Sequence, residues 1–324
     1  MFKGIVALLL GIGVLLFGVA GNAHGQKQFS IGSLNTADQF TNSFEGFRAR
    51  MAELGYRDGY NVRYQYYNSR GNDELLKTLA QKLAQDKLDL IVTSSTSATV
   101  AEAKATEASR TPVLFLSAGN PQKLVKSFAS SGSNLAGISS GSLELMGKRL
   151  ELLREIAPKA IRVAMPMDIN SVNLAANSQE VAEAAARFGF KVVELKVASP
   201  EELDKLAASI QRKNFDAIFT PADSMVSNGI EGLAKAAMSE RLPLISSLLV
   251  LVKKGALASY AADYAALGSQ GAVLADKILR GARPASLPIE LPRKYKLAIN
   301  LKTAKTIDLR IAKEILLRAD DVID

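Results

Sequence analysis

The chain has 324 residues, and its 40 basic and 32 acidic side chains give a formal net charge of +8. It contains no cysteine and one histidine, His24, which excludes disulfides, thiol chemistry, His–Cys metal sites and a serine–histidine–aspartate triad in the body of the chain. Its basic residues form no long runs interleaved with aromatic residues, so nucleic-acid binding is not indicated, and no cofactor, metal or catalytic residue is expected.

Residues 1–23 have the pattern of a secretory signal peptide. Lys3 precedes an apolar run over residues 4–20, and the small residues Gly21 and Ala23 follow it. The alternative is a membrane anchor, because the run is close to the minimum length that spans a bilayer. We expect cleavage after Ala23 or Gly25 and a mature protein in the periplasm. Without cysteine, a lipid-anchored lipoprotein is excluded.

Strand and helix patterns alternate through the rest of the chain. The first expected strands lie over residues 29–34, 61–67, 88–93, 113–116 and 134–138. Helices are expected over residues 38–54, from residue 73, and over residues 98–108 and 143–156. Such alternation predicts parallel sheets covered by helices, an α/β fold.

A weak internal repeat indicates two similar lobes. In both copies a glycine–aromatic turn is followed by a strand, a helix and a short apolar strand, which begins at Asp89 in the first copy and at Asp216 in the second. We expect two Rossmann-like lobes joined by several crossings near Gly137, Ala262 and Pro284. The expected first lobe spans residues 24–138 and is completed by about 263–285. The second spans residues 139–262 and is completed by about 286–324, with its last strand over residues 295–300.

Residues 137–141 match the G-x-S-x-G pattern of a nucleophile elbow. Ser139 would need a base, and no histidine follows His24. The alternative is structural: small residues let the chain cross between the lobes, and residues 140–142 cap the following helix.

Polar loops follow the expected strands. Because ligands bind beyond the carboxyl ends of parallel strands, these loops predict a cleft lined from both lobes. Hydroxyls that precede a helix can bind an anion, although each of them can also be a simple helix cap. The candidate ligand-binding residues are Ser95, Thr96, Ser97, Ser117, Asn120, Asn170, Asp223, Asp263 and Tyr264.

Several stretches resemble a known family. They are Phe44-Glu45-Gly46-Phe47, Asp89-Leu90-Ile91-Val92, residues 147–153 (GKRLELL), residues 299–305 (INLKTAK) and residues 316–323 (LLRADDVI). With these motifs, nearly the whole mature chain resembles ABC-transporter substrate-binding proteins of the type I periplasmic fold, in the branch that includes tryptophan/tyrosine uptake receptors. The chain departs from the family at two positions. Asn120 replaces the aspartate of a common Gly-Asp-Pro motif, and Ala261 replaces the glycine of a common Ser-Tyr-Gly-x-Asp motif.

The resemblance implies a monomeric receptor, not an enzyme, which closes its lobes over a small solute and presents it to an inner-membrane permease. A sensory module that signals to a membrane receptor is the alternative. We expect an amino acid or a related small organic acid as the ligand, with its carboxylate on Ser95, Thr96 and Ser117 and its ammonium on Asp223, or on Asp263 instead. In the other interpretation Asp223 only caps its helix and the ligand is a plain carboxylate or another small molecule.

Overall fold

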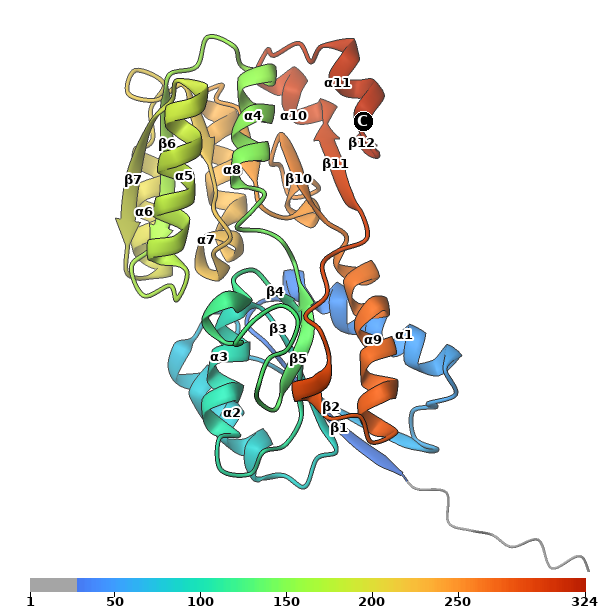
Figure 1. Ribbon diagram of the computed structural model, residues 1–324. Coiled ribbons are helices and arrows are strands. Elements are labelled where there is room, and N and C mark those ends of the chain that lie inside the picture. Colours follow the sequence, from blue (N-terminus) through green and yellow to red (C-terminus); the bar gives the residue numbers. More distant parts are fainter. Residues whose placement is uncertain (1–27) are drawn as a thin grey trace, which may run out of the picture.

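The computed structural model describes residues 28–324 (Figure 1). The expected signal peptide, its cleavage sites and His24 lie outside this range. The described residues form two α/β lobes, each built on a mainly parallel sheet with helices on both faces, so the predicted fold class is confirmed. No helix in residues 28–324 is long and apolar enough to cross a membrane.

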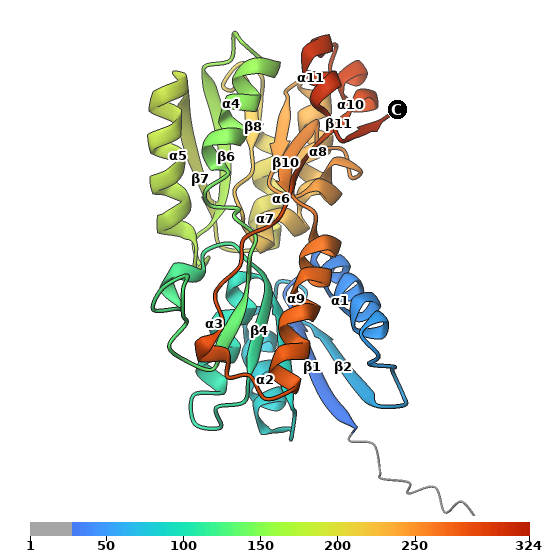
Figure 2. The same cartoon turned by 45° about the vertical axis from the view of Figure 1, so that its right-hand side comes forward.

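Lobe I contains a five-stranded parallel sheet in the order β2-β1-β3-β4-β5. Its strands are β1 (Phe29–Asn35), β2 (Val62–Asn68), β3 (Leu90–Ser94), β4 (Val113–Ala118) and β5 (Leu135–Ser139). Its helices are η1 (Asp38–Phe40), α1 (Thr41–Glu53), α2 (Asp73–Gln85), α3 (Thr96–Ala105), η2 (Pro121–Lys123), α9 (Tyr264–Leu279) and η4 (Pro284–Ser286). Helices α1 and α9 pack together on one face of the sheet, and α2 and α3 pack on the other (Figure 2). Helix α1 turns Phe44, Phe47 and Met51 inward because residues three and four positions apart share one helix face.

Lobe II contains a seven-stranded sheet in the order β12-β11-β10-β9-β8-β6-β7, in which only the β10–β11 pair is antiparallel. Its strands are β6 (Arg162–Asp168), β7 (Lys191–Val197), β8 (Ala217–Phe219), β9 (Leu244–Ser246), β10 (Ala258–Ala262), β11 (Tyr295–Asn300) and β12 (Asp321–Ile323). Its helices are α4 (Met146–Ile156), α5 (Leu174–Phe188), α6 (Pro200–Ser209), α7 (Ser224–Asn228), α8 (Ile230–Ser239), η3 (Leu249–Val252), α10 (Leu301–Thr306) and α11 (Lys313–Arg318). The prediction that residues 295–300 form the last strand is wrong, because β12 follows the terminal helices and pairs with β11.

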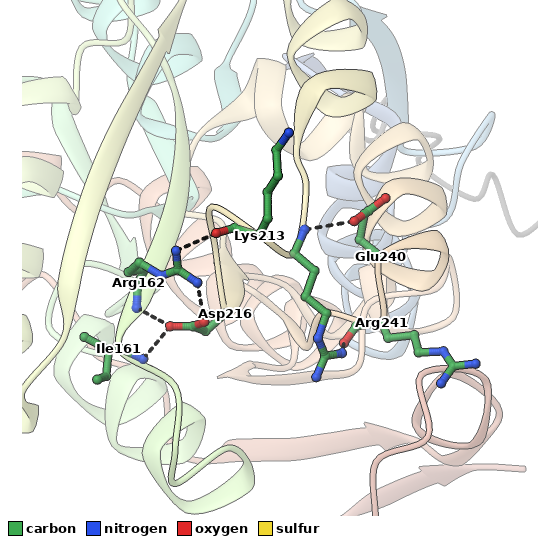
Figure 3. Close-up of polar contacts among 7 residues, drawn as sticks. Ile161, Arg162, Lys213, Asp216, Glu240 and Arg241 are labelled. Atoms are coloured by element: carbon green, nitrogen blue, oxygen red, sulfur yellow. Dashed lines mark hydrogen bonds and ion pairs between the residues drawn. The ribbon is translucent and has the colours of Figure 1, made fainter.

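The internal repeat is visible in the strand order. The order β7-β6-β8-β9-β10 in lobe II repeats the order β2-β1-β3-β4-β5 of lobe I. In lobe I, the carboxylate of Asp89 accepts a hydrogen bond from the backbone amide of Ser30. In lobe II, Asp216 accepts from the amides of Ile161 and Arg162 and from the Arg162 guanidinium (Figure 3). The side-chain bond from Arg162 holds the pKa of Asp216 at about 2, so the carboxylate remains charged where it joins the starts of β6 and β8.

Three segments cross between the lobes: β5 to α4, β10 to α9, and the strap from η4 to β11 (Figures 1 and 2). Leu287 and Ile289 of the strap are buried in lobe I, and Glu290 exchanges backbone hydrogen bonds with β5, so lobe I packing continues beyond the expected residue 285. Gly141 in the first crossing has a φ of +62°, and a Cβ there would lie 2.2 Å from the Tyr295 hydroxyl. Only glycine fits this close approach.

The G-x-S-x-G segment has a structural place at this crossing. The Ser139 hydroxyl is buried, donates to the carbonyl of Ala118 and accepts from the amide of Gly141. The prediction that residues 140–142 cap the next helix is wrong, because α4 begins at Met146 and its N-cap, Leu145, makes no side-chain cap. Ser142 is held instead by Arg149, which donates to its carbonyl and its hydroxyl.

The two lobes touch each other beside the crossings. Thr36 of lobe I lies 3.0 Å from Ser224 of lobe II, hydroxyl to hydroxyl. Ala37 and Phe40 of lobe I are buried in a hydrophobic cluster that belongs otherwise to lobe II. The cleft between the lobes is therefore closed in this structure.

Candidate functional site

A small cavity of about 30 Å³ lies where the lobes meet. Its walls come from the loops that follow β3 and β4 in lobe I and β6, β8 and β9 in lobe II. These are the carboxyl ends of parallel strands in both lobes, the position where ligands bind in open α/β sheets.

Ser95 and Thr96 form the lobe I wall at the start of α3. The Ser95 hydroxyl accepts from the amide of Ala98 (3.2 Å) and from the hydroxyl of Thr36 (3.0 Å). The Thr96 hydroxyl accepts from the amides of Gly119 (3.0 Å) and Asn120 (3.3 Å). A hydroxyl has two acceptor lone pairs and one proton, so each side chain retains its proton to donate to a ligand. Together with the positive end of α3, these donors suit a carboxylate.

The backbone of Ser95 is strained. Its φ of 91° and ψ of 155° lie in a region that is essentially restricted to glycine. Such a conformation costs about 1–3 kcal/mol and persists where the surroundings impose it. Here the two hydrogen bonds to the Ser95 hydroxyl fix the residue at the cavity wall.

Asp223 is the acidic group of the lobe II wall. It is 6% exposed, and it caps α7 by accepting from the amide of Val226 (3.0 Å). Burial, with a smaller contribution from the charge of Asp168, raises the pKa of Asp223 to about 6 against the opposing hydrogen bonds from Val226 and Ser171. No lysine or arginine in residues 28–324 forms an ion pair with it. A cationic ligand group would supply the missing partner.

Arg149 is a buried cation behind the cavity. It is 0% exposed and donates to the carbonyls of Ser142, Ser247 and Tyr260, to the Ser142 hydroxyl and to the Met146 sulfur. Burial lowers its pKa to about 10, so the guanidinium is still protonated at neutral pH. Ser142 and Ser247 line the cavity. Arg149 therefore holds two wall residues and places an unpaired positive charge behind them.

The structure brings most of the sequence-predicted residues together. Those that line the cavity are Ser95, Thr96, Ser97, Ser117, Asp223 and Tyr264. Asn120 is buried and contributes its backbone amide to Thr96 rather than its side chain to the cavity. Asn170 is exposed, because the turn after β6 directs its amide back to Asp168. Asp263 lies in a neighbouring pocket, where it caps α9 and pairs with Lys296 at 2.7 Å.

Sequence reasoning missed several wall residues. They are Phe40, Ser140, Ser142, Ser171, Asn173, Ser224, Ser227 and Ser247. Ser247 had a usable signal, because Leu-Ile-Ser-Ser at residues 244–247 resembles the apolar strand and serine pair that end at Ser95. The hydroxyls of Ser117 and Ser247 and the side-chain carbonyl of Asn173 are buried and have no hydrogen-bond partner among the described residues. These groups are free to bond a polar ligand. Residues 28–324 contain no cluster of acidic and histidine side chains suited to a metal ion.

Comparisons with known proteins place this geometry in context. A family model described as ABC transporter substrate binding protein matches residues 34–323. A tyrosine-binding protein of Clostridioides difficile is 27% identical over 287 residues, which cover 88% of this chain and 82% of the relative.

Two solved structures differ in how well they superpose. The ABC domain from Streptococcus pneumoniae in complex with L-Trp is 25% identical, covers 92% of this chain and 100% of its own, and has a TM-score of 0.84. The ligand-free, open structure of a substrate-binding protein from Clostridium difficile is 27% identical, covers 91% and 99%, and has a TM-score of 0.65. At similar identity, the better match is to the ligand complex, in agreement with the closed cleft.

Proposed function

The chain belongs to the ABC transporter substrate-binding protein family, and from this premise we propose that it carries an amino acid, held between its two lobes, to a membrane permease. Proteins of this family bind small solutes outside the cytoplasm and work with a permease. The comparisons favour transport over a sensory role.

The observation that carries the choice of ligand is a pair of buried opposite charges, Asp223 in the cavity wall and Arg149 behind it. Among residues 28–324, Asp223 has no basic partner and Arg149 has no acidic partner. The ammonium of an amino acid would pair with Asp223, and its carboxylate would lie in the favourable electrostatic potential of Arg149, so neither ligand charge is left uncompensated after it leaves water. Two relatives, named for tyrosine binding and for an L-Trp complex, support the same ligand class.

Within this function each wall has a role. Ser95, Thr96 and Ser117 donate to the ligand carboxylate, and Arg149 adds a favourable field through Ser142. Asp223 accepts from the ligand ammonium. Asp263 is satisfied by Lys296 and stays outside the site.

Binding is coupled to lobe closure. Among the described residues, lobe I consists of residues 28–138 with the returning segment from residue 263 to about 290, and lobe II consists of the remainder to residue 324. The three crossings absorb the hinge motion in a few backbone torsions. Small-angle scattering should show a smaller radius of gyration with saturating ligand, and an unchanged radius would contradict closure.

The remaining features are part of the same proposal. The signal peptide over residues 1–23 directs the chain to the periplasm and is removed, and the mature protein is a monomer that binds no nucleic acid. It is a binding protein without catalytic activity: Ser139 lies buried at the crossing and is bonded only to backbone groups.

A thermal-shift screen of the mature protein tests this function. The panel consists of the natural L-amino acids, each with its deaminated acid and its amide as matched controls. A ligand at 100 times its dissociation constant adds about 2.7 kcal/mol of stability. We expect a shift only when both the amine and the carboxylate are present. A shift of the same size with a deaminated acid would refute the assignment of Asp223.

A further inference from the structure

The cavity is small for an aromatic ligand. Its volume of about 30 Å³ compares with about 150 Å³ for an apolar cavity that accommodates benzene. Every amino acid must therefore widen the cavity by separating the lobes, and the widening that is needed grows with the size of the side chain. It is smallest for glycine and serine and largest for tyrosine and tryptophan.

The chemistry of the wall is also unsuited to an aromatic ring. Serine and threonine residues make up most of the lining, from both lobes and from the first crossing. Ser117, Ser247 and Asn173 each present a buried polar atom without a partner among the described residues. A ring placed against these atoms would leave them unpaired, whereas a short polar side chain or a bound water would satisfy them.

The two aromatic rings at the cavity are already in contact with each other. Phe40 and Tyr264 stack with their centroids 5.6 Å apart and their planes at 17°, so no ring can enter between them. A second pocket of about 170 Å³ shares Tyr264 and Leu248 with the cavity. That pocket is lined by Lys253, Lys296 and Asp321 as well as by apolar groups.

Closure of the two lobes would increase the discrimination against ligands with large side chains. Phe40 packs into the lobe II cluster. Thr36 is hydrogen-bonded to Ser95 within lobe I and to Ser224 across the cleft. Because the single proton of Thr36 is donated to Ser95, Ser224 is the donor in the contact between the lobes. A bulky side chain in the cavity would hold the lobes apart and break these contacts.

We propose that the ligand is a small amino acid with a short polar side chain or none, of the size of serine or glycine, and that the site discriminates against aromatic amino acids. This inference depends on the proposed amino acid function and makes it more specific. It separates this chain from the relatives that are named for tyrosine and tryptophan.

Calorimetric titration of the mature protein with glycine, L-serine, L-tyrosine and L-tryptophan tests the proposal. We expect glycine or serine to bind at least tenfold more tightly than either aromatic amino acid. Equal or tighter binding of tyrosine or tryptophan would overturn the inference and leave the proposed function intact. Failure of all natural amino acids to bind would overturn both.

The variant Phe40→Ala tests the mechanism of exclusion. Removal of this ring opens the stack and exposes the face of Tyr264, so the ratio of aromatic to serine affinity should rise at least fivefold. Phe44→Ala is the matched control, because it removes a buried ring of the neighbouring helix that does not line the cavity. We expect an unchanged ratio in this control. If Phe40→Ala leaves the ratio unchanged as well, the stack does not set ligand size.

Discussion

Replacement of Asp223 by asparagine should weaken ligand binding and stabilise the free protein at the same time. Asparagine caps a helix as well as aspartate, so the bond to the Val226 amide is retained. The negative charge that pairs with the ligand ammonium is lost. Truncation of one partner of a buried charge pair costs about 2–5 kcal/mol, which corresponds to a loss of affinity of roughly 30-fold or more.

The effect on stability has the opposite sign. The pKa of Asp223 is about 6 in the folded protein and 3.8 in its ordinary state. The folded protein therefore holds a proton that the unfolded chain releases, and stability falls as pH rises through this window. At neutral pH the buried charge costs up to about 3 kcal/mol, and Asp223→Asn should recover part of it.

The pH dependence of binding is the most specific test of the Asp223 charge. Below pH 6, Asp223 in the free protein becomes protonated and no longer pairs with an ammonium, so the affinity of the native protein should fall by up to about tenfold per pH unit. Asp223→Asn should show no such dependence. Asp263→Asn is the control, because Asp263 is paired with Lys296 outside the cavity, and its affinity should remain native. Native affinity in Asp223→Asn, combined with weak binding in Asp263→Asn, would refute the reasoning.

Three further predictions concern other groups at or behind the site, and a fourth concerns the buried Glu102 of α3. Ser117→Ala removes a hydroxyl that has no partner among residues 28–324, so it should weaken binding by about tenfold with no loss of stability. Thr96→Val should lower both affinity and stability, because it leaves the amides of Gly119 and Asn120 unpaired; calorimetry and urea unfolding distinguish the two variants. Ser95→Gly should be about 1 kcal/mol more stable than Ser95→Ala, since only glycine relaxes the strained φ, and equal unfolding midpoints would contradict the strain. Arg149→Met leaves the buried carbonyls of Ser142, Ser247 and Tyr260 without their donor, so it should destabilise the protein by about 3 kcal/mol or more. It should also reduce the affinity for an amino acid more than for its amide; equal losses for both would indicate a purely structural role. The pKa of Glu102 is raised to about 8 by burial without a partner for either oxygen, so native stability should fall between pH 4.5 and 8, and Glu102→Gln should have a shallower slope in urea unfolding across that range.

The main strands and helices of both lobes were accessible from the sequence because local signals agree with the fold. Apolar runs of strand length alternate with helical periodicity, and Asp89 and Asp216 mark equivalent strand starts in the two copies. Short elements could not be predicted from this periodicity. Strand β12 has three residues, is mostly exposed and owes its existence to pairing with β11, a contact that no local periodicity encodes.

The candidate site was only partly accessible. Serines that directly follow a strand, such as Ser95, were found because strand ends are predictable positions. The turn after β6 carries Asn170 outward and brings Asn173 to the cavity, which depends on a backbone turn and not on spacing. The role of Asp263 is set by Lys296 on an antiparallel strand, and that of Arg149 by carbonyls of three separate segments. Such partners are assembled only by the tertiary fold.

A crystal structure of the mature protein with its bound ligand tests the central claim most directly. The account predicts closed lobes, a ligand amine within hydrogen-bond distance of the Asp223 carboxylate, and a ligand carboxylate that accepts from Ser95, Thr96 and Ser117. A ligand bound in the neighbouring pocket beside Asp263, or a ligand with no cationic group next to Asp223, would contradict it.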